Sequence, residues 1–233
     1  KIKKYNESGS YLENTLTQSY QRIGVERELS FLLRGYTTFN NTDYALLYKS
    51  EPEGHFVGFE VDGEIGSLNI YNEIAYLSGT DKITMPGSYQ GNLLKNYFMN
   101  VLGINYRFKN NLQITVEHLF NGLGDSSNLD ASNIRYKNGL NKSLNEHVTG
   151  ISLNYEFNPL LIGKYDSKIA WQDSSHQHNI TLIKSITDNL DFILGSQINI
   201  GDRPSGSNWQ NPNIQSEFGR QNNKYFFQLK SYF

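Results

Sequence analysis

The chain of 233 residues contains no cysteine and only five prolines. Without cysteine it has no disulfide bonds, no thiolate metal site and no cysteine nucleophile. This absence also suits a folding route through the periplasm, where a stray thiol is a hazard. A long hydrophobic run is missing too, since no segment approaches the ~20 apolar residues that a membrane-spanning helix requires.

An excess of one charge is also missing. The net charge is −2 and the pI is about 6.2, which gives no electrostatic case for binding nucleic acid. The mean hydropathy of −0.56 is typical of a soluble protein. A membrane-spanning β-strand, however, contacts lipid with only every second residue, so its average hydropathy also looks polar.

What is abundant is aromatic residues, with 16 Tyr, 13 Phe and 2 Trp, a composition that favours β-strands. Apolar and polar residues alternate with a period of two along most of the chain, as in half-buried strands. In 224–233 (KYFFQLKSYF), for example, Phe227 and Leu229 lie on one face, whereas Lys224 and Lys230 lie on the other. Such a lysine-bearing face is natural if it lines water.

This alternation predicts an all-β chain of at least eleven strands. We expect them at 29–39, 43–50, 56–62, 68–77, 97–108, 112–120, 147–157, 161–171, 178–187, 190–201 and 224–233. A poorly patterned segment in 14–27 is a candidate twelfth strand. Single-chain bacterial barrels have an even number of strands, so we expect a transmembrane antiparallel up-and-down β-barrel of about 12 strands.

The predicted connections alternate between tight turns and long loops. Tight-turn signals lie at Asn40-Asn41, Asp62-Gly63-Glu64, Lys109-Asn110-Asn111, Asn158-Pro159 and Asp188-Asn189. Long polar loops are expected near 79–94, 121–146 and 202–222. Outer-membrane barrels have short periplasmic turns and long extracellular loops, so we expect 1–233 to form a single barrel domain with a periplasmic segment at 1–13.

A soluble β-barrel or sandwich is the alternative, because its strands alternate in the same way. Three features favour the membrane: strands of ~10 residues, aromatic residues near strand ends, and long loops at one end only. At Lys1 a polar stretch begins in place of a secretory signal peptide. The sequence therefore starts either at a mature N-terminus or inside a longer chain.

The polar face of the predicted strands carries fourteen charged residues, which we expect to line the lumen of the barrel. They are Arg34, Lys49, Glu60, Asp62, Glu73, Arg107, Glu117, Glu156, Lys164, Asp166, Lys168, Asp191, Lys224 and Lys230. Seven are basic and seven acidic, whereas a pore for polyanions would be expected to have a strongly basic wall. The mixture is compatible with a weakly selective pore, or with residues that pair across the lumen and fill it.

The last strand resembles the C-terminal signature of Gram-negative outer-membrane proteins. That signature is a terminal aromatic residue preceded by apolar residues at alternating positions, and Tyr225, Phe227, Leu229 and Phe233 match it. Ser231 departs from the apolar or aromatic residue usual at its position. The resemblance implies that this strand is recognised by the barrel assembly machinery during biogenesis.

A second resemblance covers roughly 54–233. The stretches concerned are FEVDGEIGSLNIYNEIAYLSGTD, GINYRFKNNLQITVEHLFNGLG, NPLL, SITDNLDFILGSQINIGDRP and SEFGR. They are similar to the C-terminal half of porin-like barrels related to alginate-export channels. Members of that family are longer, which implies that this chain can be the C-terminal part of a larger barrel.

Catalytic and metal sites are poorly supported. Asp173, Ser175, His176 and His178 crowd one loop tip together with Ser174, but nucleophilic catalysis requires an oriented base within ~3 Å of the hydroxyl. Two histidines without thiolates are also a weak metal signal. His118, next to Glu117, falls on the apolar register. We therefore predict no enzyme activity, no catalytic residue, no cofactor and no metal.

The sequence favours a channel in the bacterial outer membrane for passive diffusion of small hydrophilic solutes, with loop 121–146 as the best candidate for a constriction. The alternatives are a structural or partner-binding barrel with a filled lumen and, third, an outer-membrane enzyme. Expected partners are outer-membrane lipid and lipopolysaccharide, the barrel assembly machinery, and other copies of the chain or a larger outer-membrane complex, but not nucleic acid.

Overall fold

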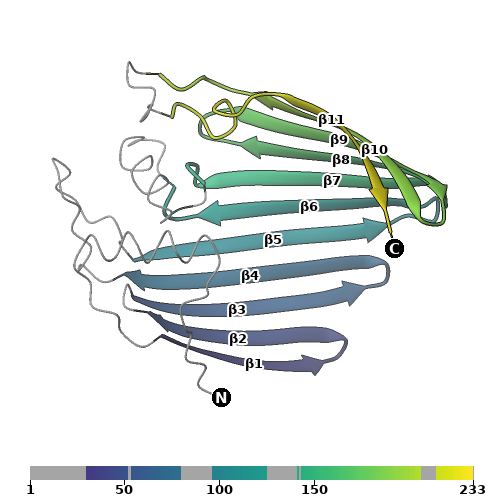
Figure 1. Ribbon diagram of the computed structural model, residues 1–233. Helices are drawn as coiled ribbons and strands as arrows, with labels where there is room; N and C mark the ends of the chain where they lie inside the picture. The colour runs from purple at the N-terminus through teal and green to yellow at the C-terminus, as the bar shows by residue number, and fades with distance from the viewer. Residues whose placement is uncertain are drawn as a thin grey trace.

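The computed structural model describes residues 30–51, 54–79, 96–124, 141, 143–205 and 214–232. These residues form eleven antiparallel strands in a single sheet, and each strand pairs with its neighbours in sequence (Figure 1). The strands are β1 (Phe31–Phe39), β2 (Thr42–Glu51), β3 (Gly54–Ile65), β4 (Leu68–Gly79), β5 (Tyr97–Arg107), β6 (Leu112–Asn121), β7 (His147–Asn158), β8 (Leu161–Ala170), β9 (Ser175–Thr187), β10 (Leu190–Ile200) and β11 (Lys224–Ser231).

This architecture confirms the all-β, up-and-down prediction and all eleven predicted strands. The candidate strand in 14–27, the N-terminal segment 1–13 and Phe233 lie outside the described residues. No helix in the described part of the chain is long and apolar enough to cross a bilayer.

One predicted turn is wrong. The sequence placed a turn at Asp62-Gly63-Glu64, but β3 continues through this segment to Ile65 and turns at Gly66-Ser67. Gly66 has a φ of +65°, the left-handed conformation that a tight hairpin turn requires and glycine adopts readily. Gly63 instead makes room within the sheet. A Cβ at position 63 would clash with the side chain of Thr42 on β2.

The two ends of the sheet differ in their connections. The turn end carries the tight hairpins, including the β1–β2 turn, in which Asn40 and Asn41 have φ values of 49° and 56°. Asparagine tolerates this conformation better than most residues, and two such residues in succession define a type I′ turn. All longer connections lie at the opposite end, here called the loop end (Figure 1).

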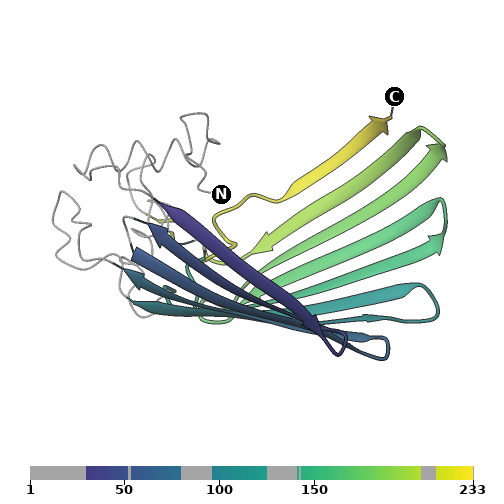
Figure 2. The same ribbon diagram turned by 90° about the horizontal axis from the view of Figure 1, so that it is seen from below.

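The sheet curves into an open trough, with β1 and β11 at its two rims (Figure 2). Among the described residues these two edge strands pair only with β2 and β10. Both run from the loop end to the turn end, because the number of strands is odd. Direct pairing of β1 with β11 would therefore be parallel and would break the antiparallel order of the sheet.

The two faces of the sheet have opposite compositions. The strand register places charged and amide side chains on one face and aliphatic and aromatic side chains on the other. On β3, β5 and β9 the side chains of the charged face are generally less exposed than those of the apolar face. Since side chains converge on the inside of a curved sheet, the charged face is the concave one.

Buried apolar side chains gather at the loop end rather than between two layers. Leu123, Leu144, Ala170, Ile214 and Phe218 are all at most 7 % exposed. They belong to what we call the loop cluster, formed by 121–124, 141, 143–146, 170–175 and 214–220. This cluster is the nearest equivalent of a hydrophobic core in the described structure, because the sheet itself has no second layer to pack against.

Candidate functional site on the concave face

All fourteen charged residues predicted from the alternation lie on the same face of the sheet. Residues paired across neighbouring strands point to the same side, so the register can be followed strand by strand. Arg34 lies opposite Leu47, which lies opposite Gly58, and Lys49 and Glu60 share that face. The same tracing places the other eleven residues there: Asp62, Glu73, Arg107, Glu117, Glu156, Lys164, Asp166, Lys168, Asp191, Lys224 and Lys230.

The register adds two carboxylates that the sequence analysis missed. Asp43 pairs with Asp62, and Glu64 pairs with Asn69, so both lie on the concave face. Each was hidden by its position at a strand end, where the alternation runs into a turn.

The concave charges are segregated by sign around the sheet. On β1–β4 the described side chains include five carboxylates and two cations, and on β8–β11 they include four lysines and two carboxylates. The even balance counted along the sequence thus hides an acidic side and a basic side. Opposite charges on facing walls produce a field across the space between them.

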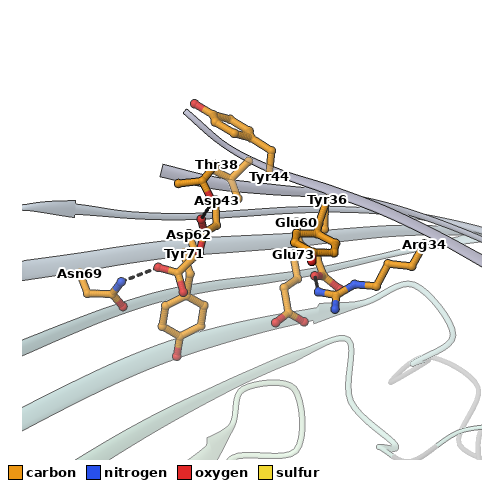
Figure 3. Close-up of a pocket in the computed structure, with 12 residues that line it drawn as sticks. Arg34, Tyr36, Thr38, Asp43, Tyr44, Glu60, Asp62, Asn69, Tyr71 and Glu73 are labelled. Atoms are coloured by element: carbon orange, nitrogen blue, oxygen red, sulfur yellow. Dashed lines mark hydrogen bonds and ion pairs between the residues drawn. The ribbon is translucent and has the colours of Figure 1, made fainter. Parts of the chain in front are cut away.

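A hollow of about 510 Å³ lies on the acidic side, over β1–β4 (Figure 3). Arg34 extends across β2 to Glu60 on β3, with 2.8 Å between Nη2 and Oε2. The hollow contains one guanidinium, that of Arg34, and four carboxylates, those of Asp43, Glu60, Asp62 and Glu73. The residues that line it are Arg34, Tyr36, Thr38, Asp43, Tyr44, Ala45, Glu60, Val61, Asp62, Asn69, Tyr71 and Glu73.

Hydroxyl and amide groups fix the carboxylates of the hollow. The Thr38 hydroxyl donates to Asp43 Oδ1 at 2.6 Å, and the Asn69 amide donates to Asp62 Oδ1 at 2.5 Å. Both bonds join neighbouring strands and leave the second oxygen of each carboxylate for other partners. The hollow is thus an acidic surface with ordered side chains (Figure 3).

Tyr71 links β4 to β6 across the concave face. Its hydroxyl donates to Glu117, and its ring lies over Gly103 on the intervening strand β5. A Cβ at position 103 would overlap this ring. Gly103 therefore allows a tyrosine to span two strands and hold Glu117 in place.

The basic side carries Lys164 and Lys168 on β8 and Lys224 and Lys230 on β11. Among the described residues none of these four lysines makes an ion pair. Their acidic neighbours bind hydroxyl groups instead: Asp166 accepts from Ser152 at 2.6 Å, and Asp191 accepts from Ser185 and Tyr232 at 2.8 and 2.9 Å. Lys230 lies over the Tyr232 ring, with its Nζ 4.7 Å from the ring centroid. Among the described residues no ion pair therefore cancels the four lysine charges.

The convex face is apolar and exposed. In the eleven described strands it carries no Asp, Glu or Arg, and its only lysine is Lys184. Three residues of the terminal-strand signature lie here: Tyr225, Phe227 and Leu229 are exposed by 74, 76 and 62 %. An exposed apolar surface of this extent normally marks contact with another protein or with a membrane.

The loop cluster is held together by two carboxylates that the sequence analysis did not select for this role. Asp173 accepts hydrogen bonds from the Asn145 amide and the Glu217 backbone N–H, both at 2.7 Å. Glu217 in turn accepts from the Leu144 backbone N–H at 2.5 Å and from the Ser143 hydroxyl at 3.2 Å. Three connections that are distant in sequence are thereby tied at the loop end.

Burial raises the pKa of the Glu217 carboxyl above its usual range. The hydrogen bonds from Leu144 and Ser143 and the nearby Arg220 lower it, and the Asp173 carboxylate adds a smaller upward contribution. Glycine makes this packing feasible, because a Cβ on Gly124 or Gly219 would overlap neighbouring backbone.

The residues weighed as catalytic do not assemble into a nucleophilic site. Ser175 and His176 are consecutive in β9, so their side chains point to opposite faces. The Ser175 hydroxyl accepts from the Phe218 backbone N–H at 3.2 Å, and Asp173 serves the loop cluster. Within the described residues no group of three or more His, Cys, Asp or Glu side chains is arranged to hold a metal ion.

No protein-family model matches this chain, and no curated protein matches it either.

Proposed function

We propose that the sheet is the wall of an outer-membrane β-barrel and that its concave face lines a water-filled passage for small hydrophilic solutes. The observation that carries this proposal is the separation of the two faces, since every strand has a charged or amide-bearing concave side and an exposed apolar convex side. A soluble barrel would show the reverse arrangement, with apolar residues inside and polar residues outside.

The dimensions of the strands agree with a bilayer. They are 8 to 13 residues long, and ten residues at ~3.3 Å each extend about 33 Å. A strand of this length tilted by about 40° covers roughly 25 Å along the membrane normal, which is the height of the apolar band of outer-membrane barrels.

The acidic hollow supports a preference for cations on one side of the passage. Four carboxylates and a single guanidinium surround it, and fixed charge raises the local concentration of the opposite ion. The lysines of β8–β11 attract anions on the other side. We therefore propose a channel of moderate selectivity for cationic or zwitterionic solutes.

The terminal strand also has a proposed role in biogenesis. Tyr225, Phe227 and Leu229 form an apolar row on an edge strand whose outer backbone has no described partner. Such a row beside an unpaired edge is what an assembly factor can recognise by strand addition. This supports the barrel assembly machinery as a partner during insertion.

The direct test is to measure the conductance of the purified protein in a planar lipid bilayer. We expect discrete current steps at low voltage and a cation preference that falls as salt concentration increases, because salt screens the wall charges. Protein that inserts into the bilayer but passes no current over several voltages and salt concentrations would overturn the channel proposal and favour a barrel with a filled lumen.

A further inference from the structure

The five histidines of the chain all lie on the apolar convex face. The register pairs His118 with Thr149 and with Leu102, His147 with Phe120, and His176 with Ile169 and Ile200. The two others, His55 and His178, lie on the same face. The concave face of the described strands, where most charged residues lie, has no histidine at all.

Four of these histidines share a height on the sheet. The register places His118 level with His176, through Thr149 and Ile169. His147 and His178 lie two residues to either side, about 7 Å along the strand. His55 lies apart, six residues beyond Val61, which is level with His118. We call His118, His147, His176 and His178 the histidine belt.

One part of the belt is a chain of hydrogen bonds. The Trp171 indole N–H donates to Thr149 Oγ1 at 2.8 Å, and Thr149 Oγ1 lies 2.9 Å from His118 Nδ1. His118 Nε2 lies 3.1 Å from His147 Nδ1, and the two rings stack with centroids 5.3 Å apart. Since Nδ1 of His147 is engaged by His118, Nε2 is the nitrogen left to meet an external group.

The other histidines are held by tyrosines. His178 Nδ1 lies 3.0 Å from the Tyr165 hydroxyl, and His55 Nδ1 lies 3.1 Å from the Tyr48 hydroxyl. His176 stacks on His178 with centroids 6.2 Å apart. In each pair a fixed ring is presented at the surface, with one nitrogen bound to the protein.

No carboxylate on this face balances the belt. The side chains from the flanking strands are Leu102 beside His118, Phe120 beside His147, and Ile169, Ile198 and Ile200 beside the β9 histidines. Within the described strands, the other titratable groups on this face near the belt are tyrosine hydroxyls. Lys184 lies on the same face but towards the turn end of β9.

We propose that the histidine belt binds the phosphate groups of anionic lipids at the loop-end membrane interface, and that it does so when the belt takes up protons. The inference rests on the proposed membrane barrel. Charge complementarity carries it, because a protonated imidazole is a cation that attracts an anionic phosphate, and the described strands carry no Asp or Glu on this face. The aromatic neighbours at this height are typical of a membrane interface.

Fluorescence of Trp171 provides a local test. The chain has two tryptophans, so in a Trp209→Phe background Trp171, which bonds to Thr149 inside the belt, is the only reporter. The protein would be reconstituted with brominated phosphatidylglycerol or brominated phosphatidylcholine, which quench a tryptophan that they contact. Phosphatidylglycerol keeps its single negative charge across this pH range. We expect its binding relative to phosphatidylcholine to rise about three- to tenfold between pH 8 and pH 5.5.

Two variants make the test specific. His118→Gln with His147→Gln should abolish most of this rise at Trp171, whereas Lys184→Gln, which removes the cation at the other end of the face, should leave the rise intact. If the first pair folds poorly, His176→Gln with His178→Gln should reduce the rise instead. A preference that is the same at both pH values, or that survives in both histidine variants, would overturn the belt proposal alone. Absence of quenching by either lipid would contradict the membrane barrel itself.

Discussion

Glu217 joins the connection before β11 to the connection before β7 in the loop cluster. Its side chain is buried, with the residue only 6 % exposed, and it accepts hydrogen bonds from Leu144 and Ser143. The carboxylate form satisfies these donors but lacks the solvation that water would give it. This loss of solvation raises the pKa of the Glu217 carboxyl.

The pKa shift predicts how the loop cluster responds to pH. A carboxyl whose pKa is higher in the folded state binds more protons folded than unfolded, so stability falls as pH rises from the unfolded pKa through the folded one. We expect the Leu144 amide to be better protected from hydrogen exchange near pH 5 than near pH 8, after correction for intrinsic exchange rates.

The matched variant is Glu217→Gln, which keeps an acceptor oxygen for Leu144 but cannot titrate. Its protection should be nearly independent of pH over the same range. Protection that increases with pH in the natural protein would show that another group controls the cluster.

At the scale of the element, each strand carries two environments in alternate residues. Ile193 and Leu194 are neighbours on β10 and similar in size, yet Ile193 pairs with Gln228 on the concave face and Leu194 pairs with Phe227 on the convex face. They form a natural pair for testing which face meets lipid.

We expect Leu194→Arg to destabilise the folded protein in lipid vesicles by about 2–4 kcal/mol, the cost of a basic residue on the lipid face near the bilayer midplane. Ile193→Arg should cost much less, because its charge faces the proposed aqueous lumen. Urea titration of folding into vesicles measures both. Equal losses for the two variants would argue against lipid on the convex face.

The strands β1–β4 act together as the acidic side of the concave face. We expect Asp43→Asn, Glu60→Gln, Asp62→Asn and Glu73→Gln in combination to lower the ratio of cation to anion permeability by about two- to tenfold, because they remove the charge that concentrates cations. Reversal potentials under a salt gradient give this ratio.

The control for this prediction lies on the opposite side. Lys224→Gln with Lys230→Gln removes two cations from β11 and should shift the permeability ratio towards cations. If both sets of variants shifted the ratio in the same direction, the segregated charges would not face a common passage.

At the scale of the whole molecule, the decisive feature is that the described sheet has an odd number of strands and two edges that run in the same direction. An antiparallel closed barrel therefore requires an odd number of further strands between β11 and β1.

Engineered cysteines test this topology without a native cysteine to interfere. Ile193→Cys with Gln228→Cys, a registered pair on β10 and β11, should form a disulfide on oxidation, because cross-strand pairs bring the Cα atoms to about 5 Å. Tyr36→Cys with Gln228→Cys, on the two edge strands, should remain reduced. Rapid cross-linking of the edge pair would show that β1 and β11 meet directly.

The sequence by itself determined the strands and their two faces. A period of two fixes which residues of one strand share a side, so the placement of Arg34 and Lys230 on the polar sides of their strands followed from alternation. The register then joined those sides into one face. Only strand-end details failed, as at Gly63, where a glycine that accommodates Thr42 was mistaken for a turn residue.

Alternation along one strand does not show which strands are neighbours or which side chains come into contact between strands. Only the tertiary structure decided these points. The separation of acidic β1–β4 from basic β8–β11, the reach of Tyr71 over Gly103 to Glu117, and the joining of Asp173 to Glu217 all depend on contacts between segments distant in sequence. The balanced wall counted from the sequence thus became a polarised one, because charge acts through distance in space and not through order along the chain.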